Sequence, residues 1–143
     1  MTEQVVDTRH IARLLAVQYL FTRAFPDNSH ENIPFEPNAL THILEVDKFD
    51  RKLYEFLVTG NDTNITKLDE FIKVNAPDRP IEQIYLVNLI ILRLAIYEAF
   101  IAKSTPPKVV INEYIEISKE LNQDSSFING VLGTIYKTQQ GIK

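Results

Sequence analysis

The feature that most constrains this chain is a long apolar stretch, IYLVNLIILRLAIYEAFIA, at residues 84–102. Its length approaches the roughly 20 residues that a helix needs to cross a bilayer. However, Asn88, Arg93 and Glu98 interrupt it, and a charged side chain near the centre of a bilayer is costly. A helix that is apolar on nearly all sides is also typical of the buried centre of a helical bundle. The stretch therefore predicts a soluble helical protein built around this segment, with no membrane association.

The size and composition of the chain favour one domain over residues 1–143. A chain of 143 residues is long enough for one well-buried core and short for two ordinary domains. Its four glycines form neither a GxGxxG nor a GxxxxGK[ST] pattern, which argues against a phosphate-binding loop. The absence of cysteine excludes disulfides and thiolate chemistry. Because the start, MTEQVVDTRH, lacks the features of a secretion signal, we expect a cytoplasmic protein.

The spacing of apolar residues predicts an all-α fold of about six to seven helices. No segment alternates with a period of two for long enough to indicate a strand. A loop is expected over residues 26–38, where three prolines occur. The expected helices cover about residues 8–25, 39–58, a short segment bearing Ile65, Leu68 and Ile72, then 81–102, a segment opened by Thr105, and 125–139.

Local signals set the expected ends of several helices. Gly60 is expected to stop the second helix, and Pro80 suits the first turn of the long apolar helix. Thr105, followed by two prolines, is a candidate N-cap. Either Asp124 or Ser125 is expected to cap the last helix.

Patterns for catalysis or metal binding are weak. The three histidines lie in different segments without HxxxH spacing, and no GxSxG motif is present. Three glutamates at helical spacing are more typical of a solvated helix face than of an acid–base pair. We therefore predict no catalytic residue, no metal site and no cofactor. The residues weighed for these roles were His10, His30, His42, Glu113, Glu116 and Glu120.

Charged and aromatic residues give a few further indications. Arg93 and Glu98 need partners in the bundle. An ion pair with another helix, or exposure of the charged end at a groove of the bundle, is favoured over a ligand site. Arg9 and Arg13 lie one helical turn apart, which favours an anionic partner about as much as a plain solvated face. Phe127 lies beside a capping segment, where an aromatic residue serves either as a hydrophobic staple, the commoner role, or as a stacking platform for an unpaired base.

Three segments near the C-terminus occur in a characteristic order: ILRLAIYEAF, TPPKVVINEYIEISKEL and FINGVLGTIYK. Near the other end stands ARLLAVQYLF. These segments resemble the NusB family of bacterial transcription antitermination factors, and the match covers nearly all of residues 8–137, strongly at both ends and weakly from 26 to 80. The resemblance implies an all-helical NusB-like bundle of two packed subdomains.

The same resemblance implies a function without catalysis. A family member binds single-stranded boxA-type RNA in ribosomal RNA leader transcripts, jointly with the small-subunit ribosomal protein NusE, within an RNA polymerase antitermination complex. Asn112 and Glu113 belong to a helix start that is mainly structural. The RNA-binding residues that the resemblance implies are Arg9, Arg13, Gln18, Phe127 and Asn129.

Other interpretations stay open. One is an RNA-binding module like that of ribosomal RNA cytosine methyltransferases, although no Gly-rich cofactor loop is present. Another is a protein-interaction or dimerisation module without RNA binding, because His10 and Ile11 separate Arg9 and Arg13 where the family commonly has a run of arginines. A hydrolase or metal enzyme would rest only on scattered carboxylates. The sequence favours neither a monomer nor a homodimer.

Overall fold

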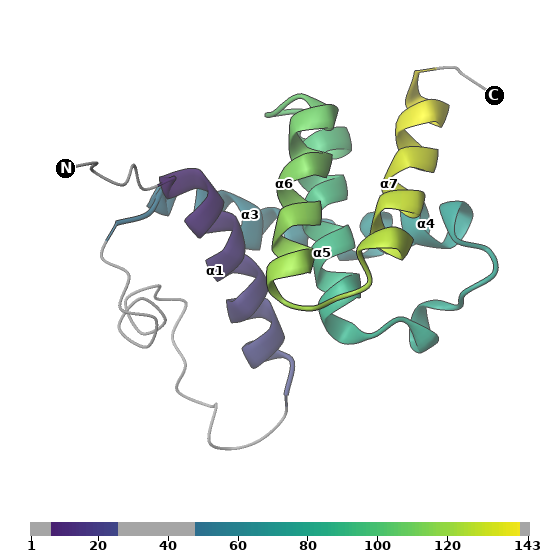
Figure 1. The fold of residues 1–143 in the computed structure, drawn as a ribbon, viewed down its shortest axis with the longest axis horizontal. Coiled ribbons are helices and arrows are strands. Elements are labelled where there is room, and N and C mark those ends of the chain that lie inside the picture. The colour runs from purple at the N-terminus through teal and green to yellow at the C-terminus, as the bar shows by residue number, and fades with distance from the viewer. Residues whose placement is uncertain (1–6, 26–47, 141–143) are drawn as a thin grey trace. The chain divides into compact units, whose positions relative to one another are not determined.

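The computed structural model of the chain describes residues 7–25 and 48–140 (Figure 1). These residues contain six α-helices, which confirms the predicted all-α fold. The chain divides into two compact units, Met1–Val58 and Thr59–Lys143. Two units agree with the two subdomains that the family resemblance implies, and each contains fully buried apolar side chains, such as Leu15 in the first and Ile117 in the second.

The first unit begins with α1 (Thr8–Arg23), which confirms the helix predicted over residues 8–25. Asp7 caps it: the Asp7 Oδ1 atom accepts a hydrogen bond from the backbone N–H of His10 at 3.0 Å. Such a bond satisfies one of the backbone donors that the first helical turn leaves unpaired. The sequence analysis assigned no cap to this helix, although aspartate is among the preferred N-cap residues.

A second aspartate begins α3 (Arg51–Thr63). The Asp50 Oδ1 atom accepts a hydrogen bond from the N–H of Leu53 at 3.0 Å. The backbone N–H of Asp50 also donates to the carbonyl of Thr8 at 3.0 Å, so the starts of α1 and α3 are held together. The loop predicted over 26–38 lies outside the described residues, as do residues 39–47 of the helix predicted over 39–58.

The prediction that Gly60 stops a helix is wrong. The helix α3 continues through Gly60 and ends at Thr63. The Tyr97 ring lies where a β-carbon on Gly60 would stand, far inside contact distance. The glycine is therefore explained by the close approach of an aromatic ring to the helix backbone and not by a left-handed end conformation.

The second unit contains the remaining helices, and α5 lies at its centre. The helix α5 (Leu86–Ile96) packs against α4 (Ile65–Asn75), α6 (Pro107–Glu120) and α7 (Ser125–Gln139). Figure 1 shows α5 beside α6, with α7 next to them. Most residues of α5 are buried, as its uniformly apolar sequence predicted.

The long helix predicted over residues 81–102 is divided into parts. It starts with a separate 3₁₀ turn, η2 (Ile81–Gln83), because Pro80 and Tyr85 have extended backbone with ψ angles of 146° and 139°. After α5 the helix widens into a π-turn, η3 (Tyr97–Ile101), in which Ala102 N–H donates to the Tyr97 carbonyl at 2.8 Å. The prediction that Pro80 lies in the first turn of the long helix is therefore wrong.

The helix starts near the C-terminus follow the sequence signals with one shift. Pro106, and not Thr105, stands at the N-cap of α6, and Pro107 takes the first helical position. Asp124, one of the two predicted candidates, caps α7: its Oδ1 atom accepts a hydrogen bond from the N–H of Phe127 at 3.0 Å. Among the described residues, no helix combines the length and apolar character that a bilayer crossing requires.

Candidate nucleic-acid interface

The start of α1 presents one exposed cation, Arg9. Half of its side chain is exposed, and its Nη1 atom lies 3.6 Å from the Asp50 Oδ2 atom. An ion pair at the surface contributes little to stability because water screens it. An exposed guanidinium of this kind suits a contact to the phosphate oxygens of an anionic chain.

Arg13 lies one turn further along α1 but is only 3% exposed. It shares a helix face with buried residues, among them Ala16, Val17 and Leu20. Arg9 and Arg13 therefore do not form a pair of solvent-facing cations. The contact of Arg13 with RNA stays a prediction, and its burial gives it a role in packing in this structure.

Gln18 is half-buried in the middle of α1. Its backbone carbonyl accepts a hydrogen bond from the Thr22 Oγ1 atom at 2.9 Å. Its side-chain Oε1 atom is enclosed and has no hydrogen-bond partner within the described part of the chain. An RNA contact of Gln18 stays a prediction, because the enclosed oxygen would have to turn outward to reach a base.

The start of α7 holds the other two predicted site residues, Phe127 and Asn129. Phe127 is half-buried, and Asn129, two residues further along the helix, is exposed. Asp124 fixes this helix start through its bond to the Phe127 N–H. Asn88, buried in α5, in turn accepts a hydrogen bond from the Asp124 N–H at 3.2 Å through its Oδ1 atom. The position of Phe127 is thus tied to the core of the second unit.

The structure adds a residue that the sequence pattern did not indicate. The Arg79 Cζ atom lies 3.9 Å from the centroid of the Phe127 ring, and its Nη1 atom lies 3.6 Å from the Asp124 Oδ2 atom. Arg79 stands in the loop between α4 and η2, far from Phe127 in the sequence. No local signal could have found it, because the packing of α4 and α5 against α7 brings the two segments together.

The structure also tests how the other prominent charges are satisfied. Arg93 in α5 makes two hydrogen bonds to Asp69 in α4, at 2.8 and 3.1 Å, which confirms the expected ion pair with another helix. Glu98, fully buried in η3, accepts a hydrogen bond from the Tyr114 hydroxyl at 3.2 Å. Both groups have structural partners, so neither needs a ligand to explain it.

Two of the three glutamates on α6, Glu116 and Glu120, are exposed as their spacing predicted, whereas Glu113 is half-buried. Glu116 and Lys119 lie 3.8 Å apart, and both side chains are more than half exposed. Asn112 is exposed near the start of the helix. Among the described residues, no group of three histidine or carboxylate side chains is arranged to hold a metal ion; His30 and His42 lie outside those residues.

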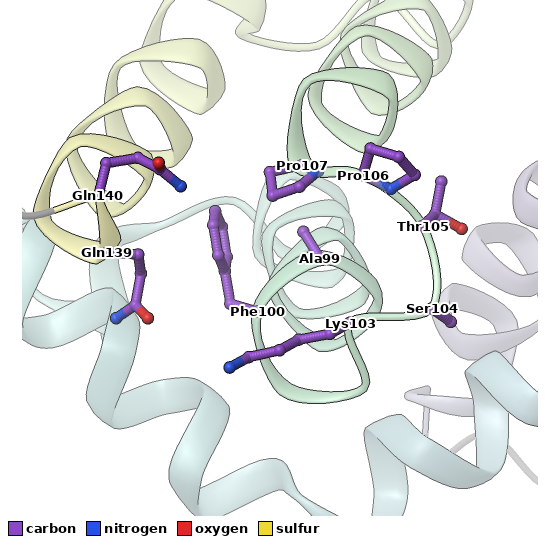
Figure 2. A pocket seen from close by; sticks show the side chains of 9 residues that line it. All are labelled: Ala99, Phe100, Lys103, Ser104, Thr105, Pro106, Pro107, Gln139 and Gln140. Atoms are coloured by element: carbon purple, nitrogen blue, oxygen red, sulfur yellow. The ribbon is translucent and has the colours of Figure 1, made fainter.

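A hollow of about 390 Å³ lies at the opposite end of α7 from Phe127. Figure 2 shows the Phe100 ring in it, between Pro107 and the end of α7 with Gln139 and Gln140. Lys103, whose φ of 53° lies in the left-handed region, extends along the opening. The lining combines an apolar floor with amide groups and one cation, and it includes none of the predicted site residues.

Comparisons with known proteins agree on one family. A sequence profile described as the NusB family matches residues 10–137. A transcription antitermination protein NusB of Shewanella amazonensis is 38% identical over 126 residues, which cover 87% of this chain and 91% of the relative. The NusB protein of Roseiflexus castenholzii is 37% identical over 134 residues, covering 89% of this chain and 90% of the relative.

Two solved structures share the fold over most of the chain. One is a crystal structure of the antitermination factors NusB and NusE in complex with dsRNA. It has a TM-score of 0.69 and 25% identity, and the match covers 94% of this chain and 99% of that one. The other, described as a plectonemic RNA supercoil, has a TM-score of 0.67 and 22% identity and covers 91% and 92% of the two chains.

Proposed function

The chain belongs to the NusB family, and on this premise we propose that it is a non-enzymatic transcription antitermination factor. It binds boxA-type single-stranded RNA in ribosomal RNA leader transcripts together with NusE, within an RNA polymerase antitermination complex in the cytoplasm. The observation that carries the proposal is the match over residues 10–137 to a family whose relatives are named transcription antitermination proteins. The fold shared with a NusB–NusE complex containing RNA supports the choice of partners.

The proposed RNA contacts are of two chemical kinds. Arg9 supplies a cation for phosphates, while Phe127 and Asn129 supply a ring and an amide for unpaired bases. Arg13 and Gln18 complete the set as weaker candidates, since both are more enclosed than Arg9. Few exposed cations serve the site, so we expect RNA binding by the chain alone to be weak and NusE to contribute much of the basic surface.

Fluorescence anisotropy of a short boxA-type RNA tests the proposal. The chain is titrated with and without NusE, against a scrambled single strand and a duplex of the same sequence; the duplex matters because the related complex was solved with dsRNA. We expect selective binding of the single strand that tightens with NusE and weakens as salt rises. Equal binding of all three RNAs would contradict recognition of boxA, and binding of none would indicate a protein-interaction module.

Single substitutions then locate the site. Arg9→Ala should weaken binding of boxA and scrambled RNA alike, because a phosphate contact carries no sequence information. Asn129→Ala should weaken boxA binding more than scrambled binding, because an amide reads base edges. Lys137→Ala serves as the matched control, since Lys137 is an exposed cation on α7 well beyond Phe127. If Lys137→Ala weakens binding as much as Arg9→Ala does, the contact at Arg9 is not specific.

A further inference from the structure

The ring of Phe127 does not offer its outer face to solvent. The Arg79 guanidinium lies over that ring, with its Cζ atom 3.9 Å from the ring centroid, which is well within the range of a cation–π contact. Asp124 holds the same guanidinium at 3.6 Å from the side. A nucleobase that approached Phe127 over this face would meet Arg79 first.

We propose that Arg79 itself is the stacking platform for an unpaired base, with Phe127 as its support. The inference rests on the proposed RNA-binding function and names the group that makes the contact. A guanidinium is planar, and its two faces are equivalent, so a base can stack on the face opposite the ring. Base, guanidinium and ring then form a three-layer stack, and the positive charge lies close to the phosphate chain.

Two observations support this arrangement. First, the Arg79 side chain is 41% exposed although Phe127 covers one side of its guanidinium, so solvent reaches this side chain beside the ring. Second, the contact with the ring restricts the rotation of the Arg79 side chain, which lowers the entropy lost when a base binds.

The substitution Arg79→Lys separates stacking from charge. Lysine keeps the positive charge but has no plane on which a base can lie. We therefore expect boxA affinity, measured in the presence of NusE, to fall about fivefold or more, while the slope of log affinity against log salt stays as in the wild type. Arg79→Gln should lower both the affinity and the slope. The control Lys137→Gln, on the same helix as Phe127, should lower the slope at most slightly. It should also respond to RNAs that lack a single base as the wild type does.

A cycle between protein and RNA identifies the stacked base. Abasic sites are placed one at a time along the boxA-type RNA, and each RNA is titrated with the wild type, Arg79→Lys and Phe127→Leu. We expect one position at which the abasic site lowers the affinity of the wild type about fivefold or more. The same abasic site should leave the affinity of Arg79→Lys almost unchanged. Phe127→Leu should reduce the effect of the abasic site at this same position and at no other. Leucine keeps the apolar contact but offers no ring to support the cation.

The other outcomes decide against the inference in different ways. If Arg79→Lys binds as tightly as the wild type, Arg79 acts as a charge only. If it weakens every RNA equally, including all abasic ones, and also lowers the melting temperature, Arg79 only positions the loop before η2. Either result overturns the stacking role and leaves the proposed function intact. If the wild type with NusE binds no boxA RNA, both proposals fail together.

Discussion

At the scale of single residues, the contact between Gly60 and Tyr97 shows how one missing methyl group permits close packing. Replacing Gly60 with alanine should improve helix propensity by about 1 kcal/mol but force the Tyr97 ring aside. Because overpacking costs about 1–3 kcal/mol, we expect Gly60→Ala to lower the free energy of unfolding. Urea denaturation followed by circular dichroism measures the change.

Gly133 provides the matched control for this substitution. It also lies inside a helix, α7, but a β-carbon there would meet nothing within 4 Å. Gly133→Ala should therefore benefit from the higher helix propensity of alanine without a steric clash. It should raise the free energy of unfolding by up to about 1 kcal/mol. A stabilised Gly60→Ala variant would show that the Tyr97 ring moves without penalty.

The ion pair between Arg93 and Asp69 supports a second prediction at this scale. Its two hydrogen bonds join α5 to α4, and the side chains are 18% and 25% exposed. Asp69→Ala should lower the free energy of unfolding by about 1–3 kcal/mol, because it leaves a largely enclosed guanidinium without its acceptor. In a double-mutant cycle, adding Arg93→Met should recover part of that loss; purely additive losses would argue against direct coupling.

Tyr97 also gives a prediction for alkaline pH. Burial raises the pKa of its hydroxyl above the ordinary value of 10.0. The unfolded chain therefore loses this proton at lower pH than the folded chain does, so stability is fully present below pH 10 and falls as pH rises toward the folded-state pKa. Tyr97→Phe should show a smaller loss of stability than the wild type between pH 9 and about 11. Parallel curves would contradict the shift.

What the sequence could reveal about residues depended on how local the relevant signal was. The capping role of Asp124 was predictable because a cap acts on the N–H groups just after it. The burial of Arg13 and the stack of Arg79 on Phe127 were not, since both depend on which face or segment meets another after folding. The apolar sequence around Arg93 made it predictable that this residue needs a partner. That the partner is Asp69 was not predictable.

At the scale of helices, two aspartate caps with the same geometry invite comparison. Asp7 and Asp124 each accept from the N–H three residues on, at 3.0 Å. Asp7→Ala should lower the free energy of unfolding by about 1 kcal/mol, whereas Asp7→Asn should be nearly neutral. Asp124→Ala should cost at least as much, because it also removes the partner of Arg79. Thermal unfolding of the four proteins, wild type included, measures the difference; equal losses for Asp7→Ala and Asp7→Asn would show that charge, not capping, matters.

The helix predicted over residues 81–102 shows a limit of hydrophobic periodicity. A uniformly apolar segment has no alternation of polar and apolar residues, so its pattern indicates neither the break before Leu86 nor the π-turn after Ile96. The existence of a buried central helix followed from composition. Its ends depended on backbone angles at Pro80 and Tyr85 that side-chain polarity does not encode.

At the scale of the whole molecule, the net charge of −4 shapes how RNA binding should respond to salt. For a single strand, each phosphate neutralised by a protein cation contributes about −0.7 to the slope of log affinity against log salt concentration. With Arg9 and Arg79 as the exposed candidates among the described residues, we expect a slope near −1.5 for the chain alone and a steeper one with NusE. A steep slope without NusE would point to cations outside the residues described.

The order in which α4, α5, α6 and α7 pack has a consequence for how the second unit folds. Most helix contacts there join neighbours along the chain, whereas the contact of α4 with α7 closes the longest loop. Contacts between sequence neighbours cost little loop-closure entropy and form fast. The second unit should therefore fold within roughly microseconds to milliseconds, with the docking of α7 on α4 as its late step.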